Sequence, residues 1–399
     1  MMQRITSLFL FLFVVFSVAQ AKLAENDIYK RLTGLTPSLS DSFYLNFKKL
    51  MQNDKREEAL GLLTKSSFFY NNILREVSSL ILTADEQTRV KYNDALALIE
   101  YIVKNDKDAR EILTANYLYV PRFASLGSDY DGKSNLLFEM ADEVFVNKDG
   151  YFYKRSPQWP DNIFSLRTTN EQIQVSSRSD VNFDIEESGI LTTRAWAEIY
   201  YKAGTNRRAV KGSFQAFICT PIEQWRDGEQ PLYRIRRDID RSPGKNPLTF
   251  RQECQKCHAP MDALAGAFAK VSFENLGNNQ ESLIFHEDVA AKYNQNTEVY
   301  PEGYVTTDSS WLNFATENHN KKFGWTGPVE GEGIKEYAAM LSRSYGFRAC
   351  LVKRVYKKLC REDLTLTDEK VKALAKNFQD DSYNLRKLFQ RVVQHEKCI

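Results

Sequence analysis

The stretch "ECQKCHAP" occupies residues 253–260, and it decides which fold the second half of the chain is expected to have. It places Cys254, Cys257 and His258 within five positions, although the 399 residues include only six cysteines and four histidines. Cys-x-x-Cys-His is the spacing of c-type haem attachment. Two cysteines three residues apart on a helix can reach the two vinyl groups of one porphyrin, and the adjacent histidine can bind its iron.

The residues around the motif favour a short helix. Thr249 and Gln252 have the spacing of a capping box, which predicts a helix start just before the cysteines. Pro260 follows the histidine and is expected to end that helix. The sequence therefore predicts one covalent haem c, with His258 as the ligand to its iron.

Three other chemistries use pairs of cysteines. A zinc site needs further Cys or His ligands at a matching spacing, and the chain has no second Cys-x-x-Cys. A thioredoxin-like redox pair is expected at a helix start within a βαβ unit, whereas this region has a helical pattern. A disulfide between Cys254 and Cys257 leaves His258 without a role. Haem attachment accounts for all three residues.

The first residues of the chain resemble a secretory signal. Arg4 precedes the apolar run "LFLFLFVVFSV", and Ala19 and Ala21 form an A-x-A cleavage site. The alternative is an uncleaved membrane anchor, but the run is short for a bilayer span of ~20 residues. We therefore expect residues 1–21 to be a signal peptide and the mature protein to be periplasmic or extracellular. No second apolar run is long enough to span a membrane after cleavage.

The overall charge argues against a nucleic-acid partner. The formal net charge is +2, and it falls to +1 without Arg4, whereas nucleic-acid binders carry a large basic excess. The 20 Tyr and 25 Phe residues indicate an ordered globular protein rather than a disordered one.

Hydrophobic periodicity predicts a mainly α protein with three parts after the signal. Residues 22–120 have the three-and-four spacing of packed helices, with turn or cap residues such as Ser40, Asp54 and Asp85. Residues 121–187 read as a hairpin and loop region, with "EVFVNKDGYFYKR" as a β-hairpin and "DYDG" as a plain turn. Residues 188–399 return to a helical pattern and form the expected helical, cytochrome c-like haem domain.

Four further cysteines, an even number in an exported chain, predict disulfides. "GFRACLVKRVYKKLC" reads as one helix, which separates Cys350 and Cys360 by about 15 Å and excludes a bond between them. The remaining pairings are Cys219–Cys350 with Cys360–Cys398, or Cys219–Cys360 with Cys350–Cys398. We favour the first because it ties Cys398, near the chain end, to the end of the helix. Buried free thiols are the alternative.

A second protein ligand to the iron would favour electron transfer over catalysis. The candidates are Met261, His286, His319, Met340 and His395. Met261 is too close to the motif along the chain to reach the opposite haem face easily. His319, in a polar loop, and Met340, at the edge of an apolar stripe, are the leading pair.

Three segments carry a family resemblance. "GILTTRAWAEIYYKAGTNRRAVKGSFQAFICTP", "FRQECQKCHAPMDALAGAFAKVSFENLG" and "YGFRACLVKRVYKKL" are similar to the haem-bearing domains of planctomycete-type cytochrome c proteins, over residues 188–399. "DAREILTANYLYV" is similar to the segment that precedes these domains in longer members. Residues 262–266 depart from the Asp-Pro-Leu-Gly that often follows the motif. The resemblance implies that Cys254 and Cys257 attach the haem and that His258 binds its iron.

Three functions fit these observations. The first is an electron-transfer protein that exchanges one electron between a low-spin haem and a redox partner protein. The second is a peroxidase- or oxidase-like haem enzyme with an open iron site. The third is a partner-docking protein whose haem is chiefly structural. The chain has no G-x-S-x-G, HExxH or Gly-rich phosphate loop to favour a hydrolase or a nucleotide-dependent enzyme.

Overall fold

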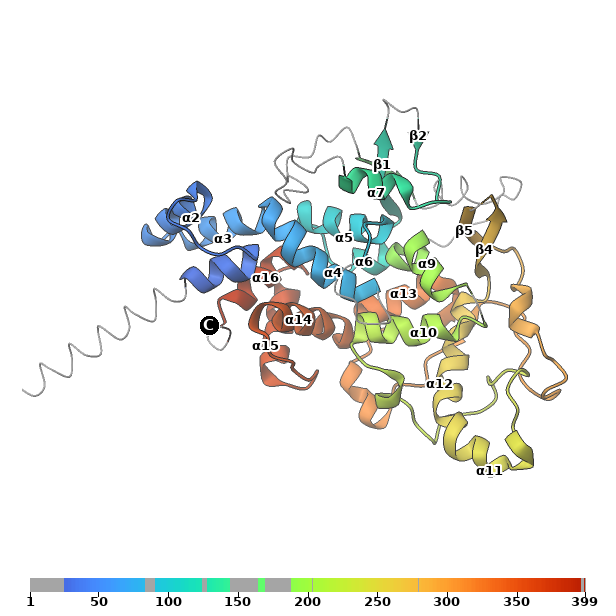
Figure 1. The fold of residues 1–399 in the computed structure, drawn as a ribbon. Coiled ribbons are helices and arrows are strands. Elements are labelled where there is room, and N and C mark those ends of the chain that lie inside the picture. Colours follow the sequence, from blue (N-terminus) through green and yellow to red (C-terminus); the bar gives the residue numbers. More distant parts are fainter. Residues whose placement is uncertain are drawn as a thin grey trace, which may run out of the picture.

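The computed structural model describes residues 25–82, 90–123, 128–143, 164–168, 188–202, 204–278, 280–395 and 398. These residues form a mainly helical protein, which confirms the predicted fold class (Figure 1). The signal peptide, the hairpin "EVFVNKDGYFYKR" and Asp85 lie outside them, except for Glu143 at the end of a helix.

The N-terminal part of the chain is helical, as its hydrophobic spacing predicted. A helix over residues 25–33 is followed by α2 (Ser42–Gln52), α3 (Arg56–Thr64), α4 (Arg75–Leu82), α5 (Asp94–Lys104) and α6 (Glu111–Thr114). The side chain that caps α2 is Asp41 rather than Ser40, and it accepts the backbone N–H of Phe43. Asp54 is a turn residue with a φ of 57°. A π-helical turn, η1 (Phe69–Leu74), leads into α4.

Helix α5 begins at Asp94 and not at Asp85, the predicted boundary residue. Residues 90–93 have no helical structure. Asn93 caps it by accepting the backbone N–H of Leu96, an arrangement that satisfies one of the free donors at a helix start.

In the C-terminal half, one long helix packs against the helices that precede and follow it. After the motif region come α13 (Gly333–Arg343), α14 (Tyr345–Cys360), α15 (Glu369–Asp380) and α16 (Leu385–Val393). Helix α14 is continuous over 16 residues, as predicted, and Ser344 caps its start. Before the motif lie α9 (Arg194–Tyr200), α10 (Arg207–Ser213) and the π-helical turn η4 (Phe214–Ile218).

Strands form three small antiparallel sheets. In residues 117–168, the order is β2 (Ser128–Asp129), β1 (Tyr117–Phe123) and β3 (Phe164–Thr168), beside helix α7 (Leu136–Glu143). The motif half was expected to be helical, but it also contains two strand pairs. These are β4 (Val271–Gly277) with β5 (Gln280–Phe285), and β6 (Ser310–Leu312) with β7 (Glu330–Glu332). The sequence analysis assigned the whole of residues 188–399 to a helical pattern, and so it did not predict these strands.

One hydrophobic cluster contains residues from both predicted helical regions, from Ile28 to Cys398. Helix α16 returns to the N-terminal helices, where Phe389 meets the ring edge of Phe69 at 5.0 Å between centroids. Arg386 on α16 also donates to the carbonyl oxygens of Val103 and Lys104. The N-terminal and C-terminal helices therefore pack together in one hydrophobic core.

The two disulfides match the favoured pairing. Cys219 is bonded to Cys350, and Cys360 is bonded to Cys398, with Cα–Cα distances of 5.1 and 4.6 Å. Cys350 and Cys360 lie on one helix and are not bonded to each other, which confirms the prediction. None of the helices among the described residues is long and apolar enough to span a lipid bilayer.

Candidate haem-attachment site

The motif lies on a helix that begins earlier than predicted. Asn246 caps α11 (Pro247–Thr249) by accepting the backbone N–H of Leu248 at 3.0 Å, so the capping box at Thr249 and Gln252 does not form. A proline at the first helical position suits this start because its missing N–H would have no helical partner. The π-helical turn η7 (Phe250–Cys254) then joins α11 to α12 (Gln255–Ala265).

Pro260 does not end the motif helix, contrary to the prediction. It lies inside α12, which continues to Ala265. A proline in a helix interior costs about 3 kcal/mol because it removes a hydrogen bond and crowds the preceding turn. The following turn offsets this cost by burying Leu264 and by fixing the Asp262 carboxylate among several donors.

The motif residues share one face of the helix with Met261. Cys254, Cys257, His258 and Met261 are each half-buried, whereas Ala259 and residues 262–265 are buried. The spacing of three, four and seven residues from Cys254 brings these side chains to one side. Both motif cysteines are free thiols. The helix thus presents two thiols and an imidazole together.

The imidazole of His258 is oriented by an acid one turn later. Its Nδ1 lies 3.3 Å from Oδ1 of Asp262. Burial alone would raise the pKa of Asp262, but the charge of Arg207, hydrogen bonds from His258 and Arg207, and the charge of Arg236 together lower the pKa well below its usual value. An ionised carboxylate only accepts hydrogen bonds, so Nδ1 of His258 is the donor in this contact, and Nε2 is the ring nitrogen that does not take part in it. Histidines that bind metals are commonly oriented in this way.

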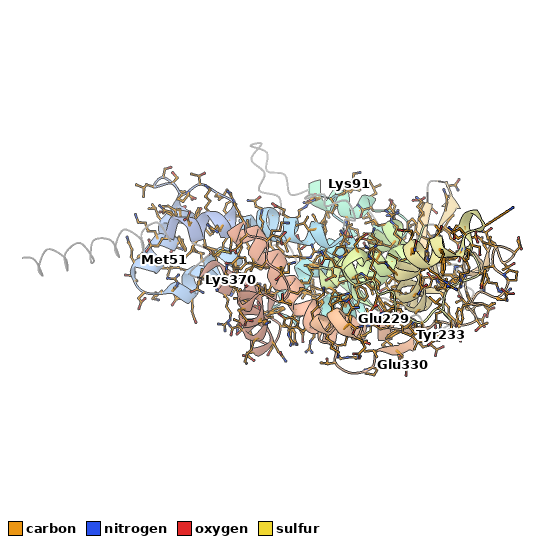
Figure 2. All side chains as sticks on the ribbon, turned by 90° about the horizontal axis from the view of Figure 1, so that it is seen from below. Met51, Lys91, Glu229, Tyr233, Glu330 and Lys370 are labelled. Atoms are coloured by element: carbon orange, nitrogen blue, oxygen red, sulfur yellow. A yellow bond between two sulfur atoms is a disulfide. The ribbon has the colours of Figure 1, made fainter. Side chains whose placement is uncertain are left out.

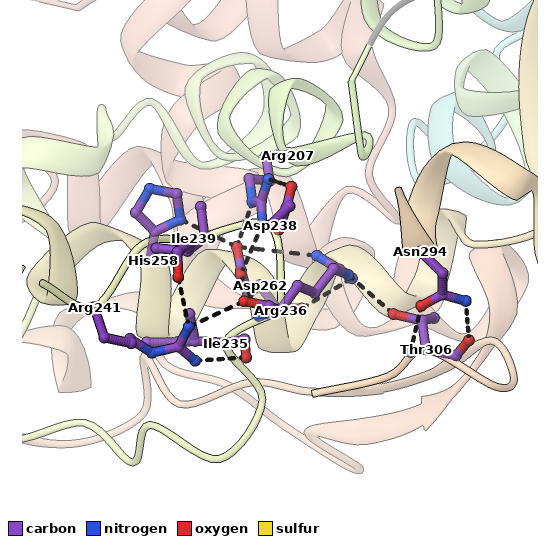
Figure 3. Close-up of polar contacts among 10 residues, drawn as sticks. All are labelled: Arg207, Ile235, Arg236, Asp238, Ile239, Arg241, His258, Asp262, Asn294 and Thr306. Atoms are coloured by element: carbon purple, nitrogen blue, oxygen red, sulfur yellow. Dashed lines mark hydrogen bonds and ion pairs between the residues drawn. The ribbon is translucent and has the colours of Figure 1, made fainter. Parts of the chain in front are cut away.

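Two arginines hold Asp262 in place (Figure 3). Arg207, on α10, donates from Nε to Oδ1 at 2.6 Å and from Nη2 to Oδ2 at 3.0 Å, and it also forms a two-pronged pair with Asp238. The backbone N–H of Arg236 donates to Oδ2 at 3.1 Å. The Asp262 side chain is fully buried, and so compensation of its charge is essential to the fold.

A loop over residues 225–246 surrounds this network. Arg236 is buried, donates to Thr306 at 3.0 Å and lies over the ring of Tyr293. Arg241 donates to the carbonyl oxygens of Ile235 and Ile239, which closes the loop beneath the motif helix. Arg236 and Arg241 are therefore structural supports of the candidate site.

The candidate sixth ligands lie in different surroundings. Met340 is 1% exposed, and its Sδ accepts a hydrogen bond from Nδ2 of Asn313 at 3.4 Å. His319 is exposed on η10 (Asn318–Phe323). The neighbouring Asn318 donates to Asp227, and Gly228, the next residue along, accepts from Gln255 on the motif helix. One turn therefore contacts both the segment of His319 and the start of α12.

The other three candidates have different positions. Met261 lies on the same helix face as His258, so it cannot occupy the opposite side of a porphyrin bound there. His286 hydrogen-bonds through Nε2 to Oγ of Ser272 at 2.6 Å, on the strand pair β4–β5. His395 packs its ring against Tyr356, next to the C-terminal disulfide.

Exposed apolar side chains concentrate before the motif. Among the described residues, eight large apolar side chains are exposed, and three of them (Leu232, Tyr233 and Leu248) lie within 25 residues before Cys254. Tyr233 is 59% exposed, and Figure 2 shows it near Glu229. An apolar macrocycle needs such surfaces to cover it. Two free thiols and an oriented imidazole on one helix form a donor set that fits a haem c.

Within the described ranges, no group of three or more His, Cys, Asp or Glu side chains has the geometry to hold a metal ion directly. Comparisons with protein-family models, with curated proteins and with solved structures found no match for this chain.

The sequence predicted the two thiols and the imidazole of the candidate site but not the residues that contact them. Arg207, Arg236, Asp238 and Asp262 were not recognised as part of the site. One signal was present, because Asp262 follows His258 by four residues, a spacing that places both on one face of a helix. The arginines come from distant segments and left no such signal.

Proposed function

We propose that the protein attaches one haem c covalently through Cys254 and Cys257, binds its iron through His258, and exchanges single electrons with a redox partner protein. The proposal includes export, so that attachment takes place on the periplasmic or extracellular side of the membrane. The resemblance to planctomycete-type cytochrome c proteins over residues 188–399 points to the same cofactor.

The observation that carries the proposal is the hydrogen bond between His258 and Asp262 on the helix face that also presents both thiols. It fixes the ring orientation and leaves Nε2 as the free nitrogen. An isolated surface histidine would need no buried carboxylate with two arginine partners. Burying the Asp262 carboxylate costs free energy of folding. Orienting a histidine that binds a metal centre is a function that accounts for this cost.

Each part of the site has a separate task. The thiol groups of Cys254 and Cys257 form the covalent attachment, and Asp262 holds the Nδ1 proton of His258. Arg207 keeps the carboxylate in place by two hydrogen bonds. A bound haem would supply the one-electron couple between ferric and ferrous iron.

Replacing Cys254 and Cys257 together with alanine tests the cofactor. The exported double variant is expected to lose haem staining after denaturing electrophoresis, because both thioether bonds are gone. Replacing Cys360 and Cys398 with serine is the matched control, since it also removes two cysteines but leaves the motif intact, and it should retain the stained band. A persistent covalent band in the double alanine variant would show the assignment to be wrong.

We further propose His319 as the second axial ligand to be tested first, because a single turn links its segment to the motif helix. The ferric protein is then expected to be six-coordinate and low-spin, and the ferrous protein to bind carbon monoxide poorly. His319→Ala should become high-spin and bind carbon monoxide readily, whereas Met340→Ala should keep the wild-type optical spectrum. Ready carbon monoxide binding by the wild-type protein would instead favour the haem enzyme with an open iron site.

A further inference from the structure

A large cleft lies away from the motif helix, where α14 meets the N-terminal helices. Its volume is about 1020 Å³, and its lining comes from the helix over residues 25–33, from α4, from the region around η4 and from α14. Figure 1 shows α14 beside α4, and the two helices are in contact. Ile73, Leu80 and Tyr200 contribute apolar surface to the cleft.

Positive charge is concentrated in this cleft. Seven lining residues are cationic and three are acidic, an excess of four charges where the whole chain has a net charge of +2. The cationic residues are Lys30, Arg31, Lys353, Arg354, Lys357, Lys358 and Arg361, and the acidic residues are Asp27, Glu76 and Asp363. The cleft therefore does not simply repeat the average composition of the surface.

Two of the three carboxylates already have cationic partners. Asp363 pairs with Lys357 at 3.0 Å, and Glu76 pairs with Lys358. Arg31 donates to the carbonyl oxygen of Leu359, an acceptor without a formal charge. Several cationic side chains in the lining thus have hydrogen-bond acceptors, but most of the positive charge has no carboxylate to balance it.

The excess of positive charge in the cleft affects the protonated form of Lys353 most directly. Burial lowers its pKa, the charges of Arg354 and Lys357 lower it further, and only Asp363 opposes the shift. No described carboxylate forms an ion pair with its ammonium group. The helix dipole does not account for a cation here, because Lys353 precedes the last turn of α14, where that effect acts. A half-buried lysine among like charges is stabilised when an anion joins it.

We infer that this cleft is a binding site for a small multivalent oxyanion, carrying carboxylate or phosphate groups, with Lys353 as its central contact. The apolar part of the lining accepts the body of such a molecule, and the cationic side formed by α14 holds its charged groups. The site does not depend on the haem, so it stands or falls independently of the proposed electron transfer.

Isothermal titration of the full-length protein at low ionic strength tests the inference, with citrate and inorganic pyrophosphate as separate probes. We expect at least one probe to bind, and Lys353→Met to weaken it about tenfold or more, the loss that follows removal of one charged hydrogen-bonding partner. Lys353→Arg should retain most of the affinity. Binding of citrate alone indicates a carboxylate ligand, and binding of pyrophosphate alone indicates a phosphate ligand.

Lys49→Met is the matched control, because it removes one exposed lysine from α2, outside the cleft lining. It should bind the probes as the wild type does. Circular dichroism without anion verifies that each variant is folded. The inference is overturned if neither probe binds the wild-type protein, or if the folded Lys353→Met variant binds as tightly as the wild type.

Discussion

The single negative charge of Asp262 is shared by Arg207, by His258 and by the backbone N–H of Arg236. Because the carboxylate is fully buried, removing one partner leaves a charge that water cannot solvate. The same contacts that stabilise the acid also define which nitrogen of His258 carries a proton. Stability and chemistry therefore depend on the same few atoms.

Lys292 shows a different outcome of burying a charge. Its Nζ donates to the carbonyl oxygen of Tyr201 and to Oδ1 of Asn206, both at 2.7 Å. Neither acceptor carries a formal charge. Burial lowers the pKa of Lys292 to about 8, and the charge of Glu274 only partly opposes the shift. The folded state therefore releases this proton at a lower pH than the unfolded chain does.

The pH dependence of stability should reveal this lysine. Between pH 8 and 10.5 the unfolded chain holds the proton that the folded protein has lost, so Lys292 makes the free energy of unfolding rise with pH in this window. The total rise attributable to Lys292 is on the order of 3 kcal/mol. Urea denaturation of the wild type and of Lys292→Met across the window measures it. Parallel pH profiles for the two proteins would contradict the prediction.

At the scale of elements, the sequence predicted the helices better than their interruptions. Helix α14 and both disulfides followed from periodicity and from the reach of a disulfide bond. The π-helical turns η1, η4 and η7 were not predicted, because each is a single turn of five or six residues, too short for hydrophobic spacing to distinguish from the helix beside it. The continuation of α12 through Pro260 was missed because burial of the next turn, which a local rule ignores, decides it.

The site was predictable only where its residues are close in sequence. Cys254, Cys257 and His258 form a local motif, and Asp262 lies one turn further. Arg207 and Arg236 reach the same carboxylate from segments 55 and 26 residues away along the chain. Hydrophobic periodicity does not predict these contacts with Asp262, because they depend on how the loop over residues 225–246 folds beneath the helix.

At the scale of the whole molecule, arginines join the two ends of the chain through backbone carbonyl groups. Arg354 donates to the carbonyl oxygen of Leu80 at 2.9 Å, and Arg386 donates to that of Val103. Every residue has a carbonyl group, so the identity of the partner leaves no trace in the sequence. Together with the shared core, these links predict that the N-terminal and C-terminal helices unfold together.

Two spectroscopic probes can measure this cooperativity. All five tryptophans lie after residue 158, so their fluorescence reports on the later part of the chain, whereas far-ultraviolet circular dichroism reports on every helix. We expect both signals to change at the same guanidinium concentration, as in a two-state transition. An earlier circular dichroism transition with unchanged fluorescence would show that the helices of residues 25–104 unfold separately.

The distribution of the six cysteines has a consequence for biosynthesis. Each disulfide includes one buried cysteine, Cys350 or Cys398, whereas Cys254 and Cys257 remain half-exposed thiols. Disulfide exchange requires access to a sulfur atom, so burial of Cys350 and Cys398 closes one sulfur of each bond to attack by the exposed pair. On the export route proposed above, early closure of these two bonds would leave Cys254 and Cys257 as the only described thiols still open to modification.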